Sequence, residues 1–163
     1  DLKIGPLRGN VETRLRKLRE GQVDATVLAL AGLKRLGLGT DGGTVLSVDD
    51  MLPAPAQGAI CVESRADAAR VATLLAAIDH KPSSIAVTAE RALLAALDGS
   101  CRTPIGGLAV FVRDGSLHLS ALVALPDGSK LWRAERKGAA DDAERMGTDA
   151  GQELRRAAGS LFA

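Results

Sequence analysis

Apolar residues recur at helical spacing near the start of the chain and at alternate positions near its end. Residues 11–18 place their apolar side chains on one helix face, with Asn10 as the predicted N-cap and Gly21 as the predicted stop. Residues 24–30, which are mostly apolar, predict a buried strand. Residues 31–37 predict a short helical turn closed by glycine. This helix-strand-helix order is typical of half an α/β unit.

The middle of the chain is predicted to alternate between loop, strand and helix. A short strand is expected at residues 44–48. The two prolines in residues 53–58 predict an irregular crossing segment, because proline fixes φ and lacks the N–H that a central strand needs. A further strand is expected over residues 59–63. Helices are expected to follow, over residues 67–78 and 83–97.

The last third of the chain has the periodicity of strands. Alternating apolar and polar residues predict three strands, over residues 108–112, 117–125 and 130–136. Two Asp-Gly turns, at residues 114–115 and 127–128, favour antiparallel hairpins between them. A final helix over residues 141–158 is expected to cover the apolar face of the sheet. The pattern therefore predicts a small α+β domain.

Composition argues against several classes of protein. The 163 residues are 46% hydrophobic but only 2% aromatic. Platforms for single-stranded nucleic acids depend on stacked aromatic side chains, so no nucleic-acid partner is expected. No apolar run approaches the ~20 residues needed to span a bilayer, so no membrane partner is expected either. Two cysteines are too few for a disulfide framework and no signal-peptide pattern is present, which predicts a cytoplasmic protein with reduced thiols.

The net charge of +1 hides an asymmetry along the chain. Up to Leu36 there are eight Lys or Arg against four Asp or Glu, so the first part is expected to prefer anions. Arg8 precedes a predicted helix N-terminus, and Arg14 borders the apolar face of that helix. A guanidinium binds a carboxylate bidentately, which makes both arginines candidates for holding a carboxylate ligand. The alternative is that they are ordinary solvated arginines.

Cys101 is the main candidate for covalent chemistry. It lies in the glycine-rich loop 97–107, beside Arg102, whose charge favours the nucleophilic thiolate. The alternative for a free cysteine is a small buried apolar residue. Cys61, in the predicted strand 59–63, is expected to be such a packing residue.

Other titratable residues are expected to be structural. His80 and His118 lack the companion ligands of a metal site, so no metal is predicted. Glu90 and Arg91, in the middle of a predicted helix, are expected to form ion pairs within that helix or between domains.

Five blocks of the sequence resemble porphobilinogen deaminase (hydroxymethylbilane synthase), in that family's order. The blocks are residues 8–15 (RGNVETRL), 29–37 (ALAGLKRLG), 53–59 (PAPAQGA), 87–92 (VTAERA) and 97–107 (LDGSCRTPIGG). One such block would be weak support. The ordered set reaches along most of the chain and identifies it as a member of this family.

The resemblance implies roles for five residues. Cys101 would carry a dipyrromethane cofactor through a thioether bond. Arg8 and Arg14 would bind the carboxylates of this cofactor, and Gly32 would approach it closely. Arg35 would face the cleft and bind substrate or cofactor. The implied activity joins four porphobilinogen units head to tail, with release of ammonia at each step, and hydrolysis then frees the linear tetrapyrrole.

The resemblance also implies a domain organisation. Residues 1–55 would complete a second domain, residues 56–79 would supply a strand and a helix of a first domain, and residues 80–163 would form the cofactor-attachment domain. The first two would be α/β remnants of periplasmic-binding-like domains. The remainder of both domains, and the family's catalytic aspartate, would come from a further N-terminal stretch about as long as this chain.

Because no residue here replaces that aspartate, the chain alone is expected to be inactive. Two interpretations remain open: a half-chain that assembles with a separate N-terminal partner, or a non-catalytic module that binds carboxylates.

Overall fold

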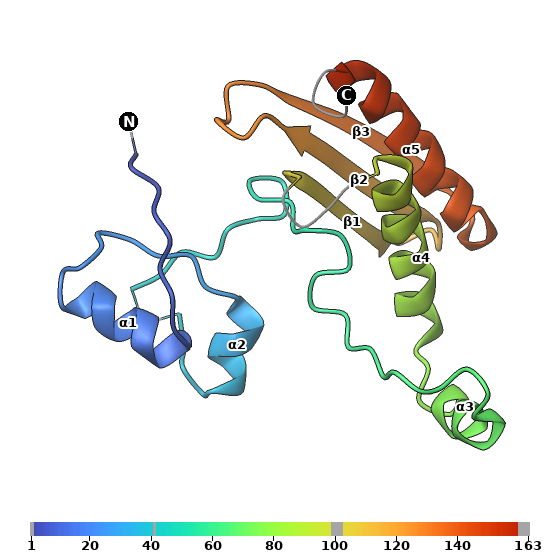
Figure 1. Cartoon of the computed structure of the whole chain (residues 1–163), viewed down its shortest axis with the longest axis horizontal. Coiled ribbons are helices and arrows are strands. Elements are labelled where there is room, and N and C mark those ends of the chain that lie inside the picture. Colours follow the sequence, from blue (N-terminus) through green and yellow to red (C-terminus); the bar gives the residue numbers. More distant parts are fainter. Residues whose placement is uncertain (1, 41, 99–102, 160–163) are drawn as a thin grey trace. The chain divides into compact units, whose positions relative to one another are not determined.

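The computed structural model describes residues 2–40, 42–98 and 103–159, which form two compact units, Asp1–Leu46 and Ser47–Ala163 (Figure 1). The first unit contains α1 (Val11–Arg19) and α2 (Leu30–Arg35). The second contains α3, α4, a three-stranded sheet and α5. Within the described residues, no helix is both long and apolar enough to cross a membrane.

The first helix forms as the sequence predicts. The side chain of Asn10 accepts a hydrogen bond from the backbone N–H of Thr13 at 2.8 Å, which is the N-cap bond. The chain leaves α1 through Gly21, whose φ of +71° suits glycine, and its N–H donates to the carbonyl of Leu18. The predicted turn over residues 31–37 is also confirmed, since it corresponds to α2 and Gly37.

The predicted strand over residues 24–30 is wrong. These residues are irregular up to Leu30, where α2 begins, and Val27 keeps 62% of its surface exposed. An apolar run forms a buried strand only beside partner strands and beneath covering elements. Neither is present among the described residues of the first unit.

Two further predicted strands, at residues 44–48 and 59–63, are also wrong. Both segments are irregular, and Ile60 is 88% exposed. The helices that follow are confirmed, as α3 (Ala69–Ala76) and α4 (Lys81–Ala96). The second begins earlier than predicted because Pro82 lies in its first turn, where the missing N–H of proline has no cost.

The three-stranded antiparallel sheet is confirmed in the order β1-β2-β3. Its strands are β1 (Ile105–Phe111), β2 (Leu117–Ala124) and β3 (Leu131–Gly138). The register pairs Ala109 with Leu119 and Ala121 with Ala134. A short 3-10 turn, η1 (Ala140–Asp142), leads into α5 (Ala143–Ala158), so the predicted final helix is confirmed.

Both long helices of the second unit pack on one face of the sheet, as Figure 1 shows. Alternate residues of β2 are buried, which gives the strict period of two expected of a half-covered strand. The core combines apolar side chains of α4, α5 and the sheet, and its largest fully buried members are Leu93, Leu97, Leu117, Leu119, Leu154 and Val123. The small α+β domain predicted for this part of the chain is therefore confirmed.

Candidate functional site

Two cationic side chains hold the loop that precedes α1. Arg14 donates from Nε to the carbonyl oxygen of Gly9 at 2.8 Å, and Lys17 donates from Nζ to the carbonyl oxygen of Arg8 at 3.0 Å. These bonds reach back from α1 over five and nine residues, so they fix how the chain enters the helix at Asn10. The side chain of Arg14 is thereby oriented toward the helix N-terminus.

The start of α1 concentrates positive charge. The first turn of a helix presents unpaired N–H groups and the positive end of the helix dipole, and Asn10 satisfies only one of those groups. Arg8 is exposed and Arg14 is half-buried beside this turn. Glu12 is the acidic residue of the first turn and offsets part of the charge. The arrangement has the donors and the charge that a carboxylate ligand requires.

The second helix brings Gly32 next to the same turn. A Cβ added to Gly32 would lie 3.6 Å from Cγ2 of Val11, the first residue of α1. The structure thus gathers the backbone of Arg8, the side chain of Arg14 and Gly32 around one helix end. Arg35 lies at the other end of α2, is exposed, and is not part of this cluster.

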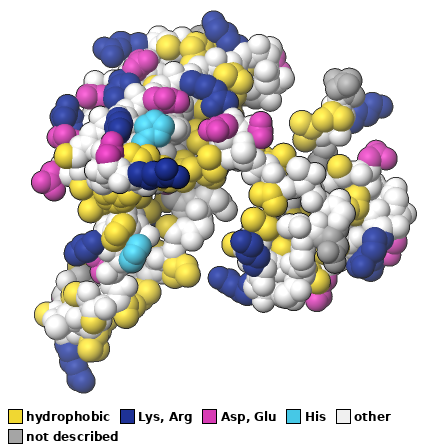
Figure 2. All heavy atoms as spheres, turned by 180° about the vertical axis from the view of Figure 1, so that it is seen from behind, with side chains coloured by type: hydrophobic (Ala, Val, Ile, Leu, Met, Phe, Trp, Pro, Cys, Tyr) yellow, Lys and Arg dark blue, Asp and Glu magenta, His cyan; other side chains and the backbone are white. Residues whose placement is uncertain are grey.

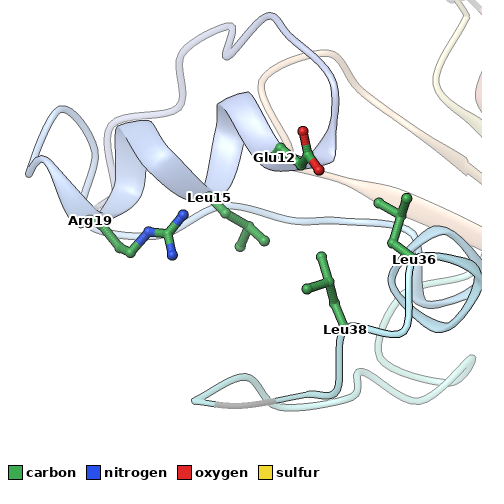
Figure 3. Close-up of a pocket in the computed structure, with 5 residues that line it drawn as sticks. All are labelled: Glu12, Leu15, Arg19, Leu36 and Leu38. Carbon is green, nitrogen blue, oxygen red and sulfur yellow. The ribbon is translucent and has the colours of Figure 1, made fainter.

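The hollow in the first unit is lined by a different set of residues, namely Glu12, Leu15, Arg19, Leu36 and Leu38 (Figure 3). Figure 3 shows Leu15 and Leu38 pointing toward one another across it. Most of the lining is apolar, and none of the residues predicted to bind the cofactor contributes to it. The candidate anion site is therefore the end of α1 and not this hollow.

Cys101 lies outside the described residues. The elements that flank its loop are described. The preceding α4 ends at Ala96 and is followed by the fully buried Leu97, and β1 begins at Ile105. Both flanking elements belong to the core of the second unit.

Glu90 differs most from its predicted role. Its side chain is only 5% exposed, and its carboxylate accepts backbone hydrogen bonds from Ala56 and Ala109 instead of forming an ion pair. Neither Glu90 nor Arg91 has a salt-bridge partner among the described residues. The sequence gives no direct signal for this arrangement, since any residue except proline can donate a backbone N–H.

Cys61 is also not the packing residue that was expected. It is an exposed free thiol, because residues 59–63 form no strand that would bury it. It lies in an open groove lined by residues 58–62, the last turn of α3 and one side of α4.

Both histidines make local side-chain contacts. Nδ1 of His80 lies 2.9 Å from the hydroxyl of Ser83, and Nε2 of His118 lies 3.7 Å from the carboxylate of Glu135. No group of three potential metal ligands occurs in the part of the chain that the structure describes.

Comparison with known proteins gives two family matches. The family model described as porphobilinogen deaminase, dipyromethane cofactor binding domain, matches residues 1–73. The model of the porphobilinogen deaminase C-terminal domain matches residues 84–156. The first match contains the cluster at the start of α1, and the second contains Cys101, most of α4 and the sheet.

Curated relatives agree with these matches. The chain is 50% identical over 162 residues to a porphobilinogen deaminase of Nitrobacter hamburgensis, covering 99% of this chain and 51% of the relative. It is 55% identical over 155 residues to that of Paracoccus denitrificans, covering 95% and 49%. It is 50% identical over 157 residues to the chloroplastic enzyme of Pisum sativum, covering 95% and 42%.

The basic helix end and the small α+β domain thus lie in the two matched parts of the chain. Both family models describe domains of one class of enzyme. The chain belongs to the porphobilinogen deaminase family. It spans about half the length of the curated relatives it matches.

Proposed function

We propose that this chain is the cofactor-carrying part of a hydroxymethylbilane synthase. In this proposal the Cys101 sulfur forms a thioether to a dipyrromethane, Arg8 and Arg14 bind the carboxylates of that cofactor, and Arg35 binds substrate or cofactor. The observation that carries the proposal is the order of the two family matches, first the cofactor-binding domain and then the C-terminal domain.

The residues at the start of α1 fit such a ligand. Arg14 uses Nε to bind the carbonyl of Gly9, and no other hydrogen bond of its guanidinium is found within the described residues. Its two terminal nitrogens can therefore both donate to one carboxylate, in a bidentate pair. The helix N-terminus adds N–H donors and Arg8 adds a second permanent charge. Gly32 lies beside the same turn, where a Cβ added to it would come within 3.6 Å of Val11, and it is assigned to the close approach of the cofactor.

When bound, the dipyrromethane supplies the pyrrole carbon to which new units are joined. The part of this chain is to hold the growing polymer: Cys101 retains it covalently while Arg8, Arg14 and Arg35 neutralise its carboxylates and orient it. Positive groups that are fixed before the ligand arrives stabilise accumulating negative charge without reorganisation.

The domain organisation expected from the resemblance remains part of the proposal. Residues 1–55 are assigned to a second periplasmic-binding-like domain, residues 56–79 to a first, and residues 80–163 to the cofactor-attachment domain. The apolar side chains left exposed by the first two segments support this assignment. Val27, Ile60 and Leu74 are each more than 60% exposed, and hydrophobic side chains are visible on the surface around α3 in Figure 2.

The proposed partner is the N-terminal part of the enzyme, which would cover apolar side chains of both segments and supply the catalytic aspartate. The chain alone is therefore expected to be inactive toward porphobilinogen. The cytoplasmic location predicted from the sequence remains a prediction, and the exposed free thiol of Cys61 is compatible with a reducing compartment.

The test is complementation of activity in solution. This chain is mixed with the separately produced N-terminal half of the Paracoccus denitrificans relative, and porphobilinogen consumption is measured. Activity is expected only in the mixture. If the mixture stays inactive while the isolated chain binds dicarboxylates as a stable monomer, the protein is the carboxylate-binding module and the proposal is wrong.

A further inference from the structure

The sheet of the second unit ends in two edge strands, β1 and β3, which differ in how they are protected. An edge strand can pair with another chain, because its outward N–H and C=O groups have no partner strand. The strand β3 carries four charged residues that oppose such pairing, namely Arg133, Glu135, Arg136 and Lys137. The strand β1 has the sequence IGGLAVF, without a charge or a proline. Its own side chains therefore give it no such protection.

The hairpin between β1 and β2 shows which N–H groups of β1 point outward. The N–H of Val112 donates to the carbonyl of Ser116 at 2.9 Å, across the hairpin. Backbone groups of successive strand residues alternate in direction, so even-numbered residues of β1 face β2 and odd-numbered residues face away. The N–H groups of Gly107 and Ala109 are therefore the central donors of the free edge.

Both of these donors have an acceptor that does not belong to the sheet. The N–H of Gly107 donates to the carbonyl oxygen of Pro53 at 2.8 Å. The N–H of Ala109 donates to Oε1 of Glu90, in α4, at 2.7 Å. The side chain of Glu90 is almost completely buried, so water does not compete for this bond. An incoming strand would find neither N–H group available.

The same carboxylate fastens the crossing segment, residues 53–58, along this edge. Its Oε2 accepts a hydrogen bond from the backbone N–H of Ala56 at 2.5 Å, while Oε1 holds Ala109. A carboxylate suits both bonds, because it offers two acceptor oxygens and no donor. Loss of the Glu90 carboxylate would leave both N–H groups without this acceptor and loosen the crossing segment.

Two glycines of β1 make room for the backbone that covers the edge. A Cβ on Gly107 would lie 3.2 Å from Cγ of Pro55, and a Cβ on Gly106 would lie 3.2 Å from the carbonyl oxygen of Leu52. Glycine inside a strand weakens it, and often marks a place where another backbone approaches closely. The composition of β1 therefore matches a strand whose edge is covered.

We propose that the Glu90 carboxylate and the crossing segment form an edge cap that closes β1, and that opening this cap lets two copies of the chain pair through β1. A second copy is the expected occupant, because β1 is uncharged and its antiparallel pairing with itself brings no like charges together. This inference does not depend on the proposed function.

The test compares the whole chain with Glu90→Met, which keeps an unbranched side chain but lacks the carboxylate. Hydrogen exchange at the amides of Gly107 and Ala109, and the mass in sedimentation, are measured at low and high chain concentration. In dilute Glu90→Met, exchange at Ala109 is expected to be about tenfold faster, as for the loss of one buried hydrogen bond. At high concentration the mass should rise above that of the unmodified chain and the protection of both amides should return. In the unmodified chain, exchange at these amides should not depend on concentration.

Adding Val110→Lys to Glu90→Met separates edge pairing from a general loss of folding. Val110 is exposed, so a lysine there leaves the core intact and places a positive charge on each edge. The double variant is expected to return to the mass of the unmodified chain, with fast exchange at Ala109 at every concentration. Association that persists in the double variant would overturn the proposal.

Leu154→Val is the control for lower stability. Leu154 is fully buried in α5, which packs on β2 and β3, so its truncation weakens the same core away from the edge cap. The variants are compared at temperatures where Trp132 fluorescence shows them equally folded. If Leu154→Val gave the same dependence on concentration at Gly107 and Ala109, the proposal would be wrong.

Glu90→Gln covers the case in which Glu90→Met does not fold. Glutamine keeps one acceptor oxygen and presents its NH₂ group to one of the two amides, so smaller changes in the same direction are expected. The proposal is overturned if neither mass nor exchange changes in Glu90→Gln. It is also overturned if Glu90→Met exchanges faster at Ala109 but keeps the mass of the unmodified chain at every concentration. None of these readouts needs porphobilinogen or a bound cofactor, so their outcome is separate from that of the proposed function.

Discussion

Gly147 of α5 packs directly against the backbone carbonyl oxygen of Ala89 in α4, so closely that a Cβ at residue 147 would overlap that oxygen. One turn later, a Cβ on Gly151 would lie 2.6 Å from the Cβ of Ala96. The two helices that cover the sheet therefore approach through small residues, and their separation is set by the absence of a single side-chain carbon.

We expect Gly147→Ala to destabilise the second unit by about 2–3 kcal/mol, at the upper end for overpacking, because a backbone carbonyl cannot rotate away. This loss exceeds the gain of roughly 0.5–1 kcal/mol that alanine brings to a helix interior. Denaturant unfolding followed by Trp132 fluorescence measures it. Gln152→Ala, at an exposed position of α5, is the control and is expected to be neutral or slightly stabilising. Equal stability of both variants would contradict the packing.

The cap of α1 gives a second prediction. Asn10→Ala removes the acceptor for the N–H of Thr13 and is expected to destabilise the helix by about 1 kcal/mol. This loss corresponds to hydrogen exchange about fivefold faster at the amide of Thr13. Asn10→Asp keeps the acceptor oxygen and should retain the protection. Hydrogen exchange resolved at Thr13 compares the two variants. Identical exchange in Asn10→Ala and the unmodified chain would show that the cap bond does not form.

The pair formed by Asp114 and Lys137 predicts a pH dependence. Hydrogen bonds from Lys137, at 2.6 Å, and from Ser116 hold the pKa of the Asp114 carboxyl well below its ordinary 3.8. The folded state therefore favours the charged carboxylate, and this stabilisation is complete above the unfolded pKa. It is lost as the pH falls below about 4 toward the folded pKa. Asp114→Asn should lower the melting temperature near neutral pH and approach the unmodified chain in acid.

Asp127→Asn is the matched control for that titration. Asp127 occupies the equivalent place in the second hairpin turn, and its pKa is lowered chiefly by the hydroxyl and N–H of Ser129, without a lysine. The difference in melting temperature between Asp127→Asn and the unmodified chain should therefore vary less with pH and with salt than the difference between Asp114→Asn and the unmodified chain. If the curves of Asp114→Asn and the unmodified chain run parallel from neutral pH to pH 2, the charge of Asp114 does not stabilise the fold.

Gly32 offers a test of the anion site that is separate from folding. Its added Cβ would make only an ordinary contact with Val11, so Gly32→Ala should fold at least as stably as the unmodified chain. If Gly32 approaches the cofactor as proposed, activity in the complemented mixture should fall on the order of tenfold or more, because a small misplacement is costly in catalysis. Ala31→Ser, at the exposed neighbour, should keep full activity. Full activity of Gly32→Ala would remove this glycine from the site.

The sequence could predict those elements whose partners lie close along the chain. The three strands pair through short hairpins, and the Asp-Gly turns at residues 114–115 and 127–128 carry their own signal. The strand expected at residues 24–30 needs neighbours that no local pattern provides, and the apolar run alone did not make it a strand. β1 begins at Ile105, before the predicted residue 108, because Gly106 and Gly107 contribute no side chain to the alternating pattern.

In the candidate site, too, some features could be predicted from the sequence and others could not. The placement of Arg8 and Arg14 beside the start of α1 could be predicted, because a basic pair next to a helix N-cap is visible in the sequence. The role of Glu90 could not, because its partners are backbone amides of Ala56 and Ala109, whose residue type is immaterial. Close approaches such as that of Gly107 to Leu93 depend likewise on the path of the backbone.

Intact mass spectrometry of the chain from the complemented mixture tests the central claim, the attachment of a dipyrromethane to Cys101, most directly. The unmodified chain is expected to carry an adduct of two pyrrole units, and Cys101→Ser is expected to carry none, whereas Cys61→Ser should retain the adduct. An adduct that persists in Cys101→Ser, or an active mixture in which the chain has its bare mass, would contradict the assignment of Cys101 as the anchor.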